Sequence, residues 1–399
     1  MGWTPADSLV IGISSRALLK LDEEDRIYRT DGTQAFIDYQ RRHEDDPIPQ
    51  GVAFNLIESL LRLNDKLGNA NKPAIEVVIL SKNHPDCAIR VKKTLQHHKM
   101  DIKRAVFTGG ESTLPYLRAF QVGLFLSKEE DAVKAAIEHG IPAGLIYGGP
   151  DNPTKPGGTP ILAFDGDAVL FSDEADQVYK QEKLPGFDAF EHKNSDVPLP
   201  PGPLHKFALA LEEVRQPHPI DSPPFRIALV TARDLKYCER PMRTLRKFGI
   251  RVDQAAFCGD MSKRIVLEEL RPLIFFDDTK RNCDDACIST PTAIVPAITQ
   301  KIVTTVSSST DSSKWPDTFM GICKMFLRKD YSEAEPIVTK WYDENLSSLT
   351  DEALESFMAE FQRSADGTPP GRQRRAPAAS NSDVSKLVQF LDQLKSKHG

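Results

Sequence analysis

Two stretches of the chain share several identical residues at the same spacing. When Ile13–Tyr28 is aligned with Phe164–Tyr179, six positions are identical at a constant separation of 151 residues. Farther along the chain the separation becomes 150, as between Gly109 and Gly259. Because a run of matches in one register does not easily arise by chance, the sequence predicts two copies of one folding unit. The alternative is that the two segments are merely similar α/β units.

Within each copy, short apolar runs alternate with stretches in which apolar residues recur at helical spacing, such as 204–214 and 265–270. Continuous apolar strands separated by helices are typical of a parallel sheet covered on both faces. The sequence therefore predicts two duplicated α/β domains, each a doubly wound, Rossmann-like parallel sheet. The expected strands are Leu9–Ile13, Ile75–Leu80, Ala105–Phe107, Leu124–Leu126, Ala143–Ile146, Ile161–Phe164, Ile227–Val230, Ala255–Phe257, Leu273–Phe276 and Ala293–Val295.

The domain boundaries follow from shifts in composition. The proline-rich segment Pro150–Pro160 is predicted to join the two domains, which then span residues 1–150 and 151–305. Residues 306–399 are predicted to form an α-helical C-terminal extension, because apolar residues there recur at helical spacing. Within the extension, residues 364–381 are rich in proline, glycine and arginine and are predicted to be a disordered linker.

Composition excludes several classes of protein. The chain has 399 residues, and its net charge of −6 provides no basic field to attract nucleic acid. No apolar run reaches the roughly 18 residues that span a bilayer, and no secretory leader is visible. The six cysteines lack the paired spacing of a zinc site. We therefore expect a cytoplasmic protein that binds neither nucleic acid nor membranes; the sequence leaves a homo-oligomer open.

Polar side chains gather where the strands of the second copy end. In open parallel sheets, ligands bind beyond the carboxyl ends of the strands, so residues at these ends are the first candidates for a site. Taken alone, each of them has a structural interpretation, since an aspartate that follows a strand is commonly a turn residue or a helix cap. The order Asp-x-Asp, Thr, Lys, Asp-Asp favours one common site. Its candidates are Asp165, Asp167, Thr231, Lys263, Asp277 and Asp278.

This set of residues suits phosphoryl transfer. Asp165 is the expected nucleophile, which attacks phosphorus and forms an aspartyl-phosphate. Asp167 is expected to give a proton to the leaving oxygen and then to take one from water, which requires a raised pKa. Thr231 would donate a hydrogen bond to the phosphoryl group, and Lys263 would offset its charge.

A cluster of carboxylates repels itself unless a cation binds to it. Carboxylate oxygens are the hard ligands that Mg²⁺ prefers, and Mg²⁺ also takes a phosphate oxygen of the substrate. Mg²⁺ is therefore the expected cofactor. Its expected ligands are Asp165, Asp167, Asp277 and Asp278.

The ordered set resembles the four motifs of the haloacid dehalogenase superfamily of phosphohydrolases. The longer strings A-F-D-G-D-A-V-L-F-S-D-E at 163–174 and L-V-T-A-R at 229–233 are similar to the cytosolic 5′-nucleotidase I family. So are K-x3-L-E-E-L-R-P-x-I-F-F-D-D at 263–278 and S-S-R-A-L at 14–18. The resemblance covers roughly residues 9 to 296. One departure is G-D-M-S-K at the lysine, where the family has G-x-P-K.

The resemblance implies a haloacid dehalogenase-like fold and Mg²⁺-dependent hydrolysis of nucleoside 5′-monophosphates of the AMP or IMP type. It carries the nucleophile and the acid/base over to Asp165 and Asp167. A phosphatase of another small phosphoester is the alternative within enzymes, because the four motifs fix the chemistry and not the leaving group. A non-catalytic nucleotide-binding or assembly protein is the alternative outside them.

Other residues are expected to contact the substrate. Segment 180–203, between the first two motifs of the second copy, is a possible cap or substrate loop, in which Phe187 and His192 can reach the base or ribose. Either side chain has a simpler interpretation, as a packed aromatic residue or an ordinary loop histidine. The candidates next to the motif residues are Gly166, Ala232 and Arg233.

The first copy has lost the carboxylates. It carries Ser14 and Arg16 where the second copy has Asp165 and Asp167, so we expect it to be non-catalytic. Hydroxyls, basic groups and a Gly-Gly turn remain and would suit an anion. A second nucleotide site is therefore one hypothesis, and a crevice of ordinary polar loop residues is the other. The residues of this possible site are Ser14, Arg16, Ser81 and Asn83.

Overall fold

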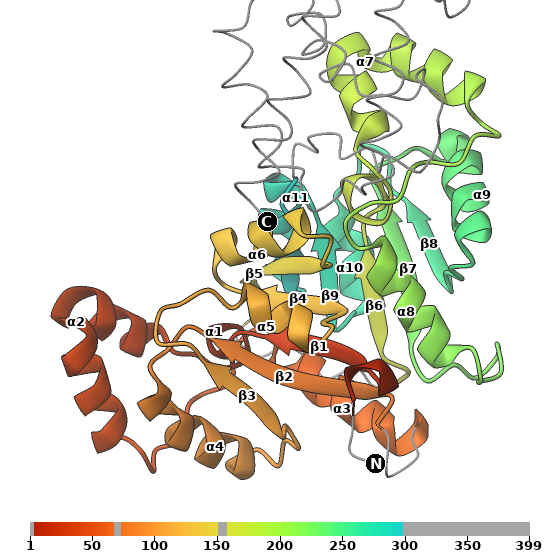
Figure 1. The fold of residues 1–399 in the computed structure, drawn as a ribbon. Helices are drawn as coiled ribbons and strands as arrows, with labels where there is room; N and C mark the ends of the chain where they lie inside the picture. The colour runs from red at the N-terminus through yellow and green to blue at the C-terminus, as the bar shows by residue number, and fades with distance from the viewer. Residues whose placement is uncertain (1–3, 68–72, 151–157, 298–399) are drawn as a thin grey trace, which may run out of the picture. The chain divides into compact units, whose positions relative to one another are not determined.

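The structure is a computed structural model that describes residues 4–67, 73–150 and 158–297 (Figure 1). The predicted helical extension and its linker lie outside the described residues, as does most of the proline-rich joint. Among the described residues, no helix combines the length and apolar character that crossing a membrane requires. The cysteines in this part of the chain are free thiols.

Ten strands form one sheet, in the order β3-β2-β1-β4-β5-β10-β9-β6-β7-β8. All ten predicted strands are present, with bounds that differ from the prediction by at most two residues. They are β1 Leu9–Ile13, β2 Ile75–Ser81, β3 Arg104–Phe107, β4 Leu124–Ser127, β5 Ala143–Gly148, β6 Ile161–Phe164, β7 Arg226–Thr231, β8 Gln254–Phe257, β9 Ile274–Asp277 and β10 Thr292–Ile294.

The sheet consists of two halves with the same strand order. Read outward from the centre, the first half runs β5-β4-β1-β2-β3 and the second runs β10-β9-β6-β7-β8. Pairing within each half is parallel, as between Gly12 and Val78 or Ala163 and Ala228. The halves meet where β5 and β10 pair antiparallel, with Ala293 opposite Ile146. The sequence did not predict this junction, which makes one continuous sheet of the two halves.

Helices cover both faces of each half (Figure 1). The α-helices lie between the strands along the chain, as expected for crossover connections. They are α1 Ser15–Leu18, α2 Asp22–Arg42, α3 Phe54–Leu67, α4 Ala88–His97, α5 Leu114–Ala119, α6 Glu130–Glu138, α7 Glu174–Lys193, α8 His205–Arg215, α9 Glu239–Phe248, α10 Lys263–Leu270 and α11 Lys280–Ala286. Single turns occur at η1 Pro5–Asp7, η2 Pro85–Cys87, η3 Gly166–Leu170 and η4 Leu235–Tyr237.

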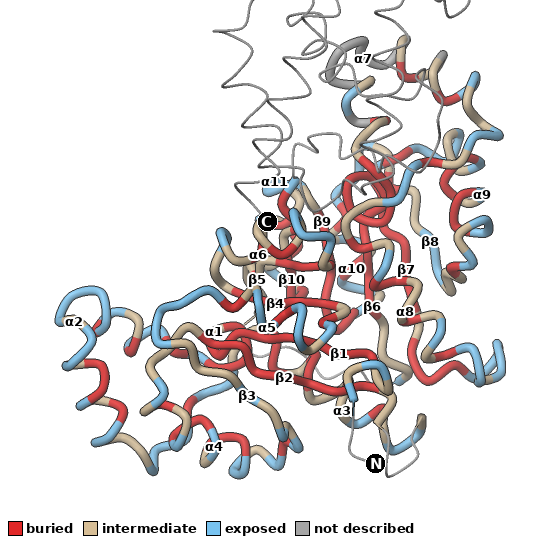
Figure 2. Tube along the Cα trace, in the orientation of Figure 1, coloured by how far each residue is buried: buried red, intermediate tan, exposed pale blue. Residues whose placement is uncertain are grey.

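The strands alternate their side chains between two apolar layers. In β6, Leu162 and Phe164 belong to the core on one face, whereas Ala163 belongs to the core on the other. Helices α8 and α9 cover the first face with residues such as Phe207, and α10 covers the second with Leu267. Figure 2 shows that the inner strands of the sheet are buried along most of their length, whereas the edge strands β3 and β8 are intermediate or exposed. This two-sided burial explains why the strands are continuous apolar runs in the sequence.

Buried polar contacts recur in the two halves. Arg90 Nε donates to the carbonyl of Asp46 at 3.0 Å, and Arg240 Nε donates to the carbonyl of Val197 at 2.8 Å. Next to each arginine lies a buried threonine whose hydroxyl donates to the arginine carbonyl at 2.8 Å and accepts from a backbone N–H. These contacts involve residues at the separations of 150 and 151 found in the sequence.

Gly202 lies where two backbone segments approach closely. A methyl group there would lie 2.2 Å from the carbonyl oxygen of Phe171 and 2.5 Å from that of Val169. Because backbone atoms must move to make room, we expect Gly202→Ala to lower the free energy of unfolding by about 1–3 kcal/mol. Urea unfolding measures this change. Gly158→Ala is the control, since a methyl group there meets nothing within 4 Å; equal unfolding midpoints for the two variants would contradict the prediction.

Candidate active site

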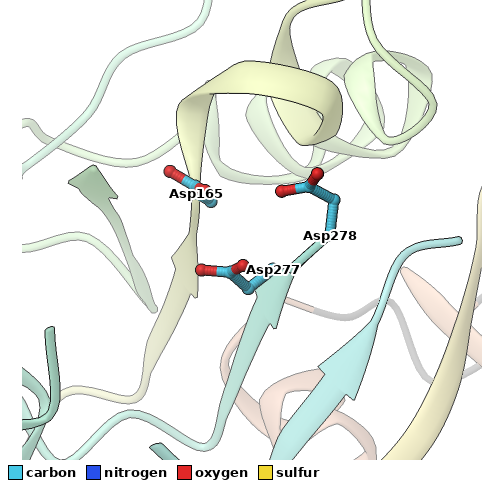
Figure 3. Close-up of side chains that lie close together, drawn as sticks. All are labelled: Asp165, Asp277 and Asp278. Atoms are coloured by element: carbon cyan, nitrogen blue, oxygen red, sulfur yellow. The ribbon is translucent and has the colours of Figure 1, made fainter. Parts of the chain in front are cut away.

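Three carboxylates meet at the carboxyl ends of β6 and β9, which are neighbours in the sheet. Asp165 follows β6, Asp277 is the last residue of β9, and Asp278 follows it (Figure 3). One oxygen of each side chain lies within 4.8 Å of the others. Asp165 and Asp277 are buried, and Asp278 is partly exposed. The strand ends therefore place three of the predicted metal ligands together.

Lys263 lies between two of these carboxylates. Its Nζ is 2.7 Å from an oxygen of Asp165 and 2.7 Å from an oxygen of Asp277. The lysine begins α10, whose N-cap Ser262 accepts a hydrogen bond from Arg264 N. Burial lowers the pKa of Lys263, but the two adjacent carboxylates outweigh it and raise the pKa above its usual value. Lys263 is therefore a buried cation held by two aspartates.

The charges at this point do not balance without a further cation. Burial raises the pKa of Asp165 well above its usual value; Lys263 lowers it, and the charges of Asp277 and Asp278 raise it further. When all three carboxyl groups are ionised, they and the ammonium group of Lys263 carry a net charge of −2. A divalent cation would neutralise this charge, and the carboxylate oxygens are the donors that Mg²⁺ and similar hard cations bind. The donor set and its charge both fit such an ion.

Backbone and amide groups hold the carboxylates in place. Gly166 N donates to Asp165 Oδ1 at 2.6 Å, and Thr279 N donates to Asp277 Oδ1 at 2.8 Å. Asn282, in α11, donates to both oxygens of Asp277 at 3.1 and 3.2 Å. These hydrogen bonds fix the orientation of the carboxylates before any ligand binds.

Thr231 ends β7, the strand beside β6, and is buried. Its Oγ1 accepts a hydrogen bond from Arg233 N at 3.2 Å. The hydroxyl proton therefore remains available to donate, as the predicted contact with a phosphoryl group requires.

The side chain of Asp167 binds an arginine and does not join the cluster of the other three aspartates. Arg233 binds both of its oxygens, with Nε donating to Oδ2 at 2.7 Å and Nη2 donating to Oδ1 at 2.8 Å. Its side chain is not part of the carboxylate cluster that Asp165 forms with Asp277 and Asp278. The structure thus brings together three of the four predicted metal-binding side chains and pairs the fourth with an arginine.

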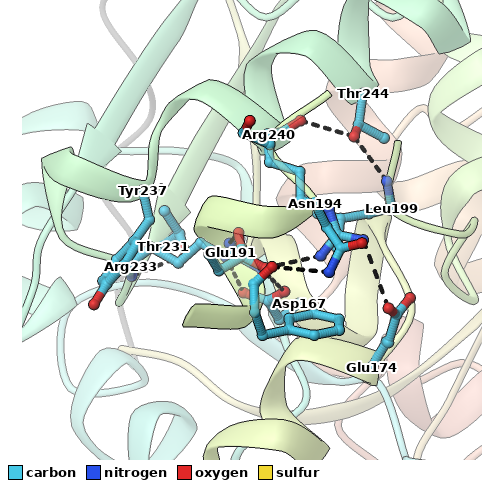
Figure 4. Close-up of polar contacts among 12 residues, drawn as sticks. Asp167, Glu174, Glu191, Asn194, Leu199, Thr231, Arg233, Tyr237, Arg240 and Thr244 are labelled. Carbon is cyan, nitrogen blue, oxygen red and sulfur yellow. Dashed lines mark hydrogen bonds and ion pairs between the residues drawn. The ribbon is translucent and has the colours of Figure 1, made fainter. Parts of the chain in front are cut away.

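A buried chain of ion pairs extends from Asp167 to α9 (Figure 4). Arg233 Nη1 donates to Glu191 Oε2 at 2.6 Å, and Arg240 Nη1 donates to Glu191 Oε1 at 2.9 Å. Glu191, in α7, and Arg240, in α9, were not identified from the sequence. A signal for Arg240 existed, because it repeats Arg90 at the separation of 150 residues. A signal for Glu191 existed as well, because it lies 151 residues beyond Gln40, whose Oε1 accepts a hydrogen bond from Arg90 Nη1 at 3.4 Å in the first half.

The predicted substrate contacts lie in different environments. Phe187 is buried; its ring packs edge-on against Tyr237, with centroids 4.8 Å apart, and lies 5.6 Å from the guanidinium carbon of Arg233. His192 is exposed near the end of α7, and Ala232 is exposed after β7. Gly166 is buried and binds the Asp165 carboxylate through its N–H. Segment 180–203 is helical up to Lys193, the end of α7.

Polar residues of the first half hydrogen-bond to one another. The hydroxyls of Ser15 and Ser81 are 2.9 Å apart, and Asn83 Nδ2 donates to Ser15 Oγ at 3.2 Å. Arg16 forms an ion pair with Asp25 at 3.0 Å. Ser14 caps α1 by accepting from Ala17 N. The four residues of the possible second site therefore lie near the ends of β1 and β2 and contact residues of the first half, while Arg16 Nε is buried and has no hydrogen-bond partner among the described residues.

Known proteins have sequences similar to this one. The family model described as 5′-nucleotidase matches residues 1–301. Human cytosolic 5′-nucleotidase 1B is 30% identical over 282 residues, which are 69% of this chain and 46% of that protein. The chain therefore spans about half the length of the curated relative that it matches. The extent of the family match establishes the conclusion that the motifs implied: this chain belongs to the 5′-nucleotidase family, and within it to the cytosolic 5′-nucleotidase I group.

Proposed function

We propose that the protein is a Mg²⁺-dependent 5′-nucleotidase that hydrolyses nucleoside 5′-monophosphates of the AMP or IMP type. The observation that carries the proposal is the placement of Asp165 beside Lys263, Asp277 and Asp278 in a chain of this family. The human relative is a cytosolic 5′-nucleotidase by name, which supports the same reaction and a cytosolic location for this chain.

The first half of the reaction transfers the phosphoryl group to the protein. An oxygen of Asp165 attacks phosphorus, forming a P–O bond to the carboxylate while the bond from phosphorus to the 5′ oxygen breaks. The leaving oxygen takes a proton from Asp167, and the nucleoside departs. Thr231 donates a hydrogen bond to one phosphoryl oxygen, and Lys263 stabilises the charge on the others.

The second half of the reaction returns Asp165 to its free form. Asp167 accepts a proton from a water molecule, whose oxygen attacks phosphorus and displaces the Asp165 carboxylate. Inorganic phosphate leaves, and Asp167 carries a proton taken from water in place of the one that left with the nucleoside. Asp165, Asp277 and Asp278 would hold Mg²⁺, which when bound offsets the charge of the carboxylates and of the phosphate.

We also infer that the two halves are copies of one unit and that only the second is catalytic. The common strand order and the repeated contacts of Arg90 and Arg240 support a duplication. Ser14 and Ser127 occupy the positions of Asp165 and Asp277, so the first half lacks the carboxylates that the reaction needs.

The test of the proposed function is phosphate release from a panel of nucleoside monophosphates and sugar phosphates. We expect release from AMP or IMP in Mg²⁺, and loss of activity in EDTA that added Mg²⁺ restores. A preference for sugar phosphates would favour a phosphatase of another small phosphoester. Absence of release from every compound would favour a non-catalytic nucleotide-binding or assembly protein and would contradict the proposal.

A further inference from the structure

The carboxylate of Asp167 is held away from the other aspartates by an arginine. Both of its oxygens accept hydrogen bonds from Arg233, and the paired side chains are only 11% and 4% exposed. A carboxyl group in a two-point contact with a guanidinium group is strongly oriented. To meet the 5′ oxygen of a substrate, Asp167 must exchange this contact for a new one.

Arg233 has a second carboxylate partner that is not part of the proposed chemistry. Its Nη1 donates to Glu191 of α7 at 2.6 Å, and Glu191 is itself held by Arg240 at 2.9 Å. A buried cation that loses its only counter-charge is destabilised by several kcal/mol. Because Glu191 remains in place, Arg233 keeps a counter-charge when Asp167 leaves it.

The same arginine is packed against α7 by an aromatic residue. Phe187 of α7 lies 5.6 Å from the guanidinium carbon of Arg233 and contacts Tyr237 of η4. Asp188, next to Phe187, accepts hydrogen bonds from Tyr237 and, at 3.0 Å, from Lys236. Helix α7 thus holds Arg233 from two sides, through the charge of Glu191 and the ring of Phe187.

We propose that Arg233 is a positioning residue that acts through Asp167, and that Glu191 of α7 sets how readily Arg233 releases it. Arg233 fixes the carboxylate in one orientation near the reaction centre; Asp167 takes up a proton from solvent as it leaves Arg233 and then turns to the 5′ oxygen of the substrate. Glu191 then serves as the partner that Arg233 retains. This inference rests on the proposed function, in which Asp167 is the acid and base.

A double-mutant cycle tests whether Arg233 acts through Asp167. We measure kcat and KM for AMP in Mg²⁺ for the unmodified protein, Arg233→Gln, Asp167→Ala and the double variant. We expect Arg233→Gln to lower kcat by about tenfold or more with little change in KM, and to have almost no further effect once Asp167 is absent. Arg233→Lys, which keeps the charge, is expected to recover part of kcat.

A second variant keeps Arg233 and changes only its retained partner. In Glu191→Gln, Asp167 is the remaining carboxylate bound to Arg233. Release of Asp167 from Arg233 then costs more free energy, so we expect kcat to fall and KM to stay unchanged. When Asp167 is already replaced by alanine, we expect Glu191→Gln to cause no further fall in kcat. This variant keeps the test decisive if Arg233→Gln does not fold. Arg243→Gln is the control, because Arg243 lies in α9 on the surface and binds Asp196 and Glu239.

The outcomes separate this inference from the proposed function. If the effects of the Arg233 and Asp167 variants add, or if KM changes more than kcat, then Arg233 contacts the substrate directly and the inference is wrong. A fall in KM for Glu191→Gln leads to the same conclusion. If the unmodified protein hydrolyses no nucleotide, then the proposed function is wrong, and the inference falls with it.

Discussion

Asp165→Asn is expected to reduce phosphate release from AMP by a factor on the order of 10⁴–10⁶, because the amide cannot attack phosphorus. The fold should survive this change. Burial and two neighbouring carboxylates raise the pKa of Asp165, so a neutral side chain of the same shape removes an unfavourable charge. We therefore expect the melting temperature to be unchanged or higher. Steady-state assays and a thermal melt in EDTA measure the two effects.

The control for this variant is Asp221→Asn. Asp221 is exposed in the loop before β7, at the end of the strand opposite Thr231, so full activity is expected. Activity of Asp165→Asn within tenfold of the unmodified protein would show that another group is the nucleophile. An inactive protein with a much lower melting temperature would instead indicate a structural role for Asp165.

Lys263→Met is expected to lower both activity and stability. The ammonium group is 2.7 Å from Asp165 and from Asp277, and its side chain is only 4% exposed. Removing it leaves two buried carboxylates without their cation, which we expect to cost about 3–5 kcal/mol of unfolding free energy in EDTA. The value of kcat should fall by about 10²–10³-fold, the usual effect of removing one group that stabilises charge in the transition state.

Mg²⁺ should stabilise this variant more than the unmodified protein. A cation that binds only the folded state adds about 2.7 kcal/mol of stability when its free concentration is 100 times its Kd. The variant lacks the ammonium group that offsets the carboxylates, so we expect it to bind the cation more tightly. Thermal melts over a range of Mg²⁺ concentrations measure the difference. Lys280→Met is the matched control, since Lys280 is 71% exposed and pairs with Asp284 on the surface of α11. Equal responses of the two variants to Mg²⁺ would contradict the assignment of the metal site.

Most strands could be predicted because the inner strands of the sheet are buried on both faces, whereas the edge strands β3 and β8 are only partly buried. A strand such as Ile161–Phe164 must then be an uninterrupted apolar run, which is easily seen in a sequence. The pairing of β5 with β10 could not be predicted, because the antiparallel contact depends on which edges of the two halves meet. In the structure Gly144 of β5 leaves room for this contact, since a Cβ there would lie 3.2 Å from Ala293 of β10, but a lone glycine in a strand does not identify its partner in advance.

The convergence of Asp165, Lys263 and Asp277 could be predicted because parallel strands end at a common edge of the sheet. Their chemical roles stay predictions. The contact between Asp167 and Arg233 could not be predicted, since side-chain orientation depends on the surroundings. Glu191, which lies 24 residues beyond Asp167, is at the repeat position of Gln40, but the repeat does not indicate that a carboxylate there would bind Arg233.

The antiparallel junction between β5 and β10 has a consequence for how the two halves can communicate. Strands on opposite sides of that junction run in opposite directions, so the carboxyl ends of the two halves point to opposite edges of the sheet. A molecule bound at the ends of β1 and β2 therefore cannot touch a substrate bound at Asp165. Within the described residues the two halves share one core and the β5–β10 junction, so an influence of the first half on hydrolysis would pass through them, as a change in the rigidity of the core or in the position of β9 and β10.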